Sequence, residues 1–219
     1  ITSGLVGSEM CIRDRYEASK MPLKFFLKFF QNHGLFKLKN RPQWYTVAKR
    51  SRTYVTKVLS SISGEYYKNY NVNRLIRRSN GIDLYYGDKS EFFSYDKVVL
   101  ASHADQALSI IDEPTKEEQE ILSKFKYREN IAVIHTDESI MPNNKDIWSS
   151  WNSSVDKNNV ENNSITYWLN LLQNLDFNKN IFLTLNPNFK INEDKILKKV
   201  NFTHPYFDQS ALDNQDKLK

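Results

Sequence analysis

The chain has 219 residues, of which 40% are hydrophobic, 26% charged and 13% aromatic, a balance that excludes global disorder and low-complexity fibres. The single cysteine, Cys11, excludes a disulfide framework and a thiolate zinc site. The net charge of +5 comes from 31 basic and 26 acidic residues spread along the chain, which argues against a dedicated nucleic-acid binder. No apolar run reaches the roughly eighteen residues of a membrane-spanning helix.

The first residues differ from the rest of the chain. Residues 1–15 show no clear period and no secretory layout, and LVGSEMCIRDR at 5–15 resembles translated sequencing-adapter read-through. We therefore expect residues 1–20 to be a non-native or disordered leader on a fragment of a longer bacterial protein. For that protein we expect a cytoplasmic location.

Two helices are predicted in the first quarter of the chain. Over residues 22–32, apolar residues recur at helical spacing, and two further phenylalanines widen the apolar face: Leu23, Phe25, Phe26, Leu27, Phe29 and Phe30. Such a helix is either buried on two sides or lies against a membrane surface, and core packing is the favoured alternative. Ser51 is the predicted N-cap of a second helix over residues 52–62.

The period changes to two from residue 66. Strands are predicted over 72–76 and 82–86, with a turn at 87–90 before Phe92. The continuous apolar run at 98–100 predicts a strand covered on both faces, ending near Ala101 and Ser102. His103 would then lie at the carboxyl end of a buried strand, where ligands bind in open α/β sheets. The alternative is an ordinary histidine at the start of a helix over 105–111.

The second half predicts a mixture of helices and strands. Thr115 and Glu118 form a capping box that opens a helix to Phe125. Strands are expected over 131–135 and 181–185, loop or short strand over 142–163, a strand turning into a helix over 165–172, and a terminal helix over 208–218. This order predicts an α/β or mixed α+β fold with two interleaved domains.

Common catalytic and metal motifs are absent from the sequence. There is no Gly-x-Gly-x-x-Gly, no HExxH and no Gly-x-Ser-x-Gly. His103 and His135 each have an aspartate two residues later, a pattern too frequent by chance to indicate a metal site, so none is expected. An aromatic set either walls a substrate pocket or packs in the core: Trp44, Trp148, Trp151, Tyr167 and Trp168.

Ten short segments match one family pattern in chain order. They are FFQNHG at 29–34, RPQW at 41–44, SRTYV at 51–55, DKVVLASHADQAL at 96–108, HTD at 135–137, MP at 141–142, SWN at 150–152, YWLN at 167–170, LNP at 185–187 and HP at 204–205. Together they resemble the flavin-containing amine oxidoreductases, in the bacterial branch described as predicted NAD/FAD-binding proteins. One departure is Ala48-Lys49-Arg50, where the family usually has a glycine pair.

The resemblance implies a monoamine-oxidase-like fold, in which an FAD-binding Rossmann-type domain is interleaved with a substrate domain. The family's N-terminal glycine-rich βαβ and its C-terminal glycine-rich segment are both absent here. The implied division is a helical part of the substrate domain at 21–62, a partial FAD-binding domain at 63–111, a substrate domain with a mixed sheet at 112–205, and a terminal helix at 206–219 that leads to a missing FAD segment.

The resemblance also implies a set of site residues. Val72, Ala101, Ser102 and His103 correspond to cofactor-binding positions; Trp151, Asn152, Tyr167 and Trp168 correspond to substrate-binding positions. No residue is assigned a catalytic role, because the flavin carries the redox chemistry in such enzymes.

The predicted function is therefore a fragment of an FAD-dependent oxidoreductase. The parent would oxidise a C–N or C–C bond of an apolar amine or lipid-like small molecule, and the fragment alone would be inactive. Peripheral membrane contact through residues 22–32 is an additional hypothesis, and no nucleic-acid partner is expected. The alternative is a non-catalytic binding or interaction module with an aromatic pocket.

Overall fold

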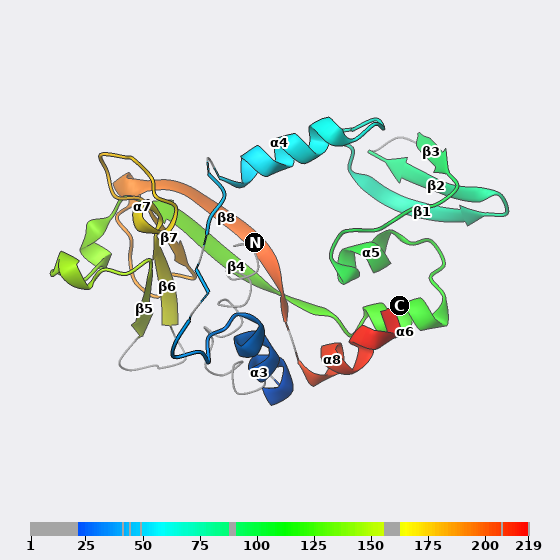
Figure 1. The fold of residues 1–219 in the computed structure, drawn as a ribbon. Coiled ribbons are helices and arrows are strands. Elements are labelled where there is room, and N and C mark those ends of the chain that lie inside the picture. The colour runs from blue at the N-terminus through cyan, green and yellow to red at the C-terminus, as the bar shows by residue number, and fades with distance from the viewer. Residues whose placement is uncertain are drawn as a thin grey trace. The chain divides into compact units, whose positions relative to one another are not determined.

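The computed structural model describes residues 22–40, 42–43, 45–48, 50–87, 91–155, 163–206 and 208–218. The expected leader and Trp44 lie outside these residues. The chain divides into two compact units, one from residues 1–50 and 128–204 and the other from residues 51–127 and 205–219. Each contains helices and an antiparallel sheet (Figure 1), so the fold is α+β.

The first unit is built on a five-stranded sheet. Its strand order is β5-β6-β7-β4-β8, and β6 pairs antiparallel with both β5 and β7. The strands are β4 (Lys126–His135), β5 (Trp151–Val155), β6 (Asn163–Trp168), β7 (Phe182–Leu185) and β8 (Ile196–Tyr206). Helix α3 (Leu23–Asn32) and the short α7 (Leu169–Leu172) belong to the same unit.

The two faces of this sheet are packed differently. On one face, Ala132, Tyr167 and Leu185 form an apolar cluster with Ile165 and Leu183. The opposite face combines apolar and polar groups: Phe182 is fully buried with Met141 and Trp148, whereas the neighbouring strand positions hold buried threonine and histidine. Alternation along each strand explains the division, because successive side chains point to opposite faces.

The second unit is built on the three-stranded sheet β1-β2-β3. Its elements are α4 (Ser51–Ser61), β1 (Val72–Arg78), β2 (Gly81–Tyr86), β3 (Phe92–Tyr95), α5 (Ala104–Ile110), α6 (Lys116–Leu122) and α8 (Gln209–Gln215). A parallel bridge between Leu75 and Ile111, with the Asp112 N–H donating to the Leu75 carbonyl over 2.8 Å, fixes the end of α5 beside β1. Gly81 is required in the β1–β2 hairpin, since its φ is +154° and an added Cβ would lie 2.7 Å from the Tyr95 carbonyl oxygen.

Most predicted elements are present. Strand β4 begins at Lys126, earlier than the predicted residue 131, and α4 begins at Ser51 itself rather than after it. Four further differences are larger. The predicted strand at 98–100 is wrong: these residues form no strand, and Val99 is 89% exposed. The capped helix α6 ends at Leu122, before the predicted Phe125. Strand β8 was not predicted. No residue of α3 is fully buried and its four phenylalanines are half-buried, so the helix is not enclosed on two sides as the favoured core packing required.

The boundaries of the two units, after residues 50, 127 and 204, differ from the domain boundaries at 62, 111 and 205 that the resemblance implies. Residues 51–62 group with the three-stranded sheet, and residues 112–127 group with it too. The assignment of FAD-binding and substrate-binding roles to these parts stays a prediction.

Candidate functional site

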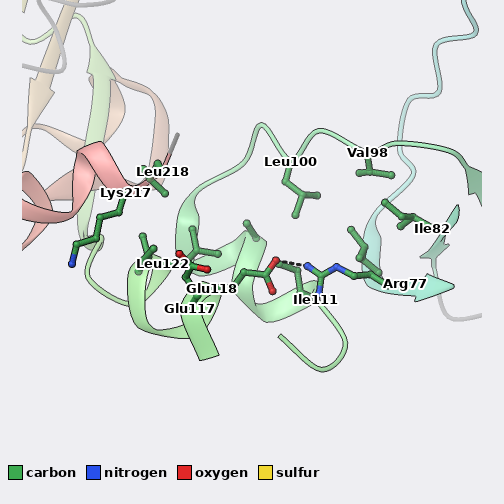
Figure 2. A pocket seen from close by; sticks show the side chains of 13 residues that line it. Arg77, Ile82, Val98, Leu100, Ile111, Glu117, Glu118, Leu122, Lys217 and Leu218 are labelled. Atoms are coloured by element: carbon green, nitrogen blue, oxygen red, sulfur yellow. Dashed lines mark hydrogen bonds and ion pairs between the residues drawn. The ribbon is translucent and has the colours of Figure 1, made fainter. Parts of the chain in front are cut away.

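The second unit contains a cavity of about 600 Å³ between its sheet and its helices. Leu75 of β1 and Ile82 of β2 line one side, and α5 and α6 line another through residues that include Ala107 and Ile121. Figure 2 shows Leu100 extending from its segment toward the helices and Val98 beside Ile82. The volume lies in the range of small-molecule sites, and the walls combine aliphatic side chains with the charged Arg77, Glu117, Glu118 and Lys217.

The charged groups at this cavity include an ion pair between β1 and α6. Arg77 donates to the Glu118 carboxylate, as the dashed line in Figure 2 shows. Glu118 also completes the predicted capping box: its backbone N–H donates to Thr115 Oγ1 over 3.1 Å, and its carboxylate accepts from the Thr115 N–H over 2.9 Å. Burial opposes the ionisation of Glu118, but the hydrogen bonds from Thr115 and the charge of Arg77 outweigh it, so its pKa is lowered.

The four predicted cofactor residues do not line this cavity. Val72 is half-buried beside a bulge at the start of β1, and Ala101 and Ser102 are exposed. His103 occupies the N-cap position of α5 without a side-chain capping bond. Its ring stacks on Tyr127 at 4.1 Å with an interplanar angle of 13°, and the Tyr127 hydroxyl accepts from the Ala104 N–H over 2.7 Å. His103 thus follows an irregular segment rather than a buried strand.

These residues do not by themselves fit FAD. A dinucleotide is held by a glycine-rich turn whose N–H groups approach the pyrophosphate, and no such turn is present in the sequence. None of the four residues lines any of the three described pockets. We therefore assign no cofactor contact and no reaction step to them.

The four predicted substrate residues lie on β5 and β6 but are divided between the two faces of the sheet. Trp151 pairs directly with Tyr167, so both point to the apolar face, where Tyr167 is buried and Trp151 is exposed. Asn152 and Trp168 alternate to the other face. The Asn152 amide donates to the Ser149 carbonyl over 2.7 Å, and the Trp168 indole donates to Asn180 over 3.0 Å.

The aromatic residues of this second face pack as core. Trp148 meets Trp168 edge to face at 5.3 Å and Phe182 at 5.7 Å, and its indole donates to the Pro142 carbonyl over 2.7 Å. No aromatic residue of this cluster lines any of the three described pockets.

A buried polar row, which the sequence did not predict, crosses the same face. The Asp137 N–H donates to His135 Nδ1 over 3.2 Å, so the ring proton lies on Nε2, which donates to Thr184 Oγ1 over 2.8 Å. The Thr184 hydroxyl is then free to donate to Thr166 Oγ1, also at 2.8 Å. Burial lowers the pKa of His135 to about 4, against a smaller opposing effect of the nearby Asp137 charge.

Asp137 is a buried carboxylate that joins the end of β4 to the loop before β8. It accepts from the Asn192 N–H over 2.9 Å, from the Ser139 hydroxyl over 2.8 Å and from the Lys195 ammonium over 3.2 Å. Burial alone would raise its pKa, but these donors outweigh burial and hold the pKa well below its usual range. With its acceptor capacity used internally, Asp137 has a structural role.

Among the described residues, no group of three or more histidine, cysteine, aspartate or glutamate side chains is placed to hold a metal ion. Within the same part of the chain, every helix is too short or too polar to cross a bilayer.

Comparisons with known proteins assign no family. No protein-family model matches the chain, and no curated protein matches it. A solved structure that it resembles is described as the crystal structure of a CLA-producing fatty acid isomerase from P. acnes, with 13% identity and a TM-score of 0.49. The match covers 75% of this chain and 42% of that one, so this chain spans less than half of the length of the isomerase.

Proposed function

We propose that this chain is part of an FAD-dependent, amine-oxidase-like oxidoreductase. The parent protein oxidises a C–N or C–C bond of an apolar amine or lipid-like substrate. The ordered series of family-like segments from residue 29 to residue 205 supports the proposal. In the proposed arrangement, FAD is held mainly by parts of the parent protein outside these 219 residues.

The observation that carries the proposal is that residues 97–100 have a strand-like sequence but form no strand in this structure. Lys97-Val98-Val99-Leu100 has the composition of a central strand, followed by the helix α5, which is the order found in open α/β sheets. In this structure the segment is not part of a strand, and Val99 is almost fully exposed. Burying a valine side chain stabilises a protein by about 1.5–3 kcal/mol, so a neighbouring strand from the parent would gain by covering it.

The apolar cavity beside this segment supports the same arrangement. Val98 and Leu100 contribute to its wall together with β1, β2, α5 and α6. A Rossmann-type half packed here would cover the exposed valine and add the missing phosphate-binding turn. It would bring the segment at 101–103 toward the cofactor, as the family resemblance implies.

The test is expression of the gene extended in both directions from this chain. We expect the extended protein to contain an upstream Gly-x-Gly-x-x-Gly and to show the flavin absorption bands with about one FAD per chain. The 219-residue chain, expressed alone, should be colourless. An extended protein without flavin, or a stoichiometric flavin spectrum from the 219 residues alone, would overturn the proposal.

A further inference from the structure

Helix α3 and the turn after it carry a surface of exposed apolar side chains. Leu23 and Leu27 lie one turn apart on α3 and are 69% and 45% exposed. Phe36 and Leu38 follow the helix and are 55% and 89% exposed. We call these four residues the α3 surface. Several large apolar side chains exposed on one segment are a feature of interaction sites.

The segment that carries this surface is held in place by its own aromatic contacts. Phe30 packs against Phe26 at 4.2 Å and against Phe36 at 5.3 Å, which folds the chain after the helix back toward α3. Gly34 makes this return possible: its φ is +64°, and an added Cβ would lie 2.8 Å from Pro42 Cδ. The exposed leucines are therefore presented by a folded helix and turn.

The charge of this part of the chain is strongly one-sided. Between residues 18 and 64 there are ten basic residues and no acidic residue. The rest of the chain contains the other 21 basic residues and all 26 acidic residues. Lys24 and Lys28 occupy the narrow polar side of α3, and Lys39 follows Leu38. Within residues 22–40 every charged side chain is a lysine.

We propose that the α3 surface docks on a lipid bilayer that contains anionic lipid. Helix α3 lies in the plane of the interface, with Leu23 and Leu27 among the acyl chains and Lys24 and Lys28 extended to headgroup phosphates. A wide apolar face and a narrow basic face suit this geometry. A second copy of the chain is a poorer partner, because pairing identical surfaces would bring two sets of like charges together.

This inference is independent of the flavin and explains why an apolar helix has no buried residue. Among the described residues of the first unit, nothing covers Leu23 or Leu27 to the level of a buried side chain. Transfer into a bilayer removes the same apolar area from water that core packing would have removed. It would also place the protein next to a supply of lipid-like molecules.

The test is co-sedimentation of the full 219-residue chain with vesicles. One set contains phosphatidylcholine only, and the other contains phosphatidylcholine with about one third phosphatidylglycerol. We expect binding to the anionic vesicles at about 0.1 M NaCl, at least about ten-fold weaker binding at about 0.5 M, and no measurable binding to the zwitterionic set. Leu23→Ser/Leu27→Ser and Lys24→Glu/Lys28→Glu should each reduce binding at least ten-fold.

Matched variants control for composition and charge. Leu197→Ser removes an exposed leucine of β8, and Lys179→Glu/Lys198→Glu reverses two exposed lysines elsewhere in the first unit. Both should bind like the unaltered chain, and circular dichroism should show unchanged helix content in all four variants. Equal binding to both vesicle types, absence of binding to anionic vesicles, or equal losses in the controls would overturn the proposal. So would a dimer in light scattering that Leu23→Ser/Leu27→Ser converts to a monomer.

Discussion

His135 illustrates how a buried side chain can be fixed in one protonation state by its neighbours. Its Nδ1 already accepts a backbone N–H, so a proton added there would remove that hydrogen bond. Its Nε2 faces a threonine hydroxyl, and the ring is fully buried with Phe182 stacked 5.5 Å away. The neutral ring is therefore the state that this site accommodates.

The protonation of His135 predicts how stability depends on pH. Its pKa is about 4 in the folded chain, against 6.5 for the unperturbed side chain. Between these values the unfolded chain binds a proton that the folded chain does not, so the free energy of unfolding falls as pH is lowered from 6.5 toward 4. The full effect is about 3 kcal/mol. Urea unfolding followed by tryptophan fluorescence at several pH values between 7.5 and 4.5 measures it.

The control for this prediction is His135→Gln, which removes the titrating group. The variant is expected to be less stable than the unaltered chain at pH 7, since the glutamine cannot reproduce both ring contacts. Its stability should, however, change much less between pH 6.5 and 4.5. An unaltered pH slope in His135→Gln would show that other groups cause the dependence.

Asp137 gives a second prediction at the same scale. Asp137→Ala leaves the Asn192 N–H, the Ser139 hydroxyl and the Lys195 ammonium without their acceptor. We expect a loss of about 2–4 kcal/mol in the free energy of unfolding at pH 7. Asp194→Ala, on the exposed part of the same loop, is the matched control and should cost less than about 0.5 kcal/mol. Similar losses in both variants would contradict the structural role assigned to Asp137.

Among the elements, α6 depends on its first residues. The Thr115 hydroxyl accepts from the Glu118 N–H, and the helix is only seven residues long, so capping is a large part of its local stability. Thr115→Ala should lower the free energy of unfolding by about 1 kcal/mol. Lys116→Ala, at an exposed helical position next to it, should be near neutral. Denaturant unfolding of the two variants measures the two losses in the free energy of unfolding. A loss in Thr115→Ala alone indicates a capping effect, whereas equal losses indicate a general effect of shortening side chains at the start of α6.

Elements governed by local chemistry could be predicted from the sequence. The capping box of α6, the helical spacing in α3 and the alternation in β2 depend on residues close together in the chain, and each element begins within one residue of its predicted start. Strand β8 was missed because five consecutive residues of it, 197–201, are exposed at the edge of the sheet, which removes the apolar alternation that reveals a half-buried strand.

The predicted strand at 98–100 was wrong for a different reason. An apolar run shows that a segment is suited to burial between neighbouring strands, but it does not supply those neighbours. The sequence also did not show which face of the sheet each predicted substrate residue occupies. Sequence neighbours such as Tyr167 and Trp168 point to opposite faces of β6. The His135–Thr184–Thr166 row gave no signal, because buried threonines have no distinctive spacing.

For the whole molecule, Val99 provides a direct test of whether another part of the parent protein completes this one. In the 219-residue chain Val99 is 89% exposed, so Val99→Asp should change the free energy of unfolding by less than about 0.5 kcal/mol. In the extended protein, the same change would place an unpaired carboxylate in a sheet interior and should cost more than about 3 kcal/mol.

Leu197→Asp is the control for both proteins, since Leu197 is 60% exposed on β8. It should be tolerated in the short and in the extended chain alike. Thermal unfolding measures the difference: Val99→Asp and Leu197→Asp are each compared with the unaltered protein, once in the 219-residue chain and once in the extended protein. If Val99→Asp is tolerated in the extended protein, residues 97–100 do not enter a covered sheet there.

The division of the chain into two units has a consequence for synthesis. Residues 1–50 belong with residues 128–204, and all of residues 51–127 leave the ribosome between them. Residues 22–50 of the first unit are therefore translated before its strands β4 to β8 and before the whole intervening unit. The intervening unit in turn is complete only after residues 205–219 have been translated. Each unit can therefore complete its fold only after part of the other has been translated.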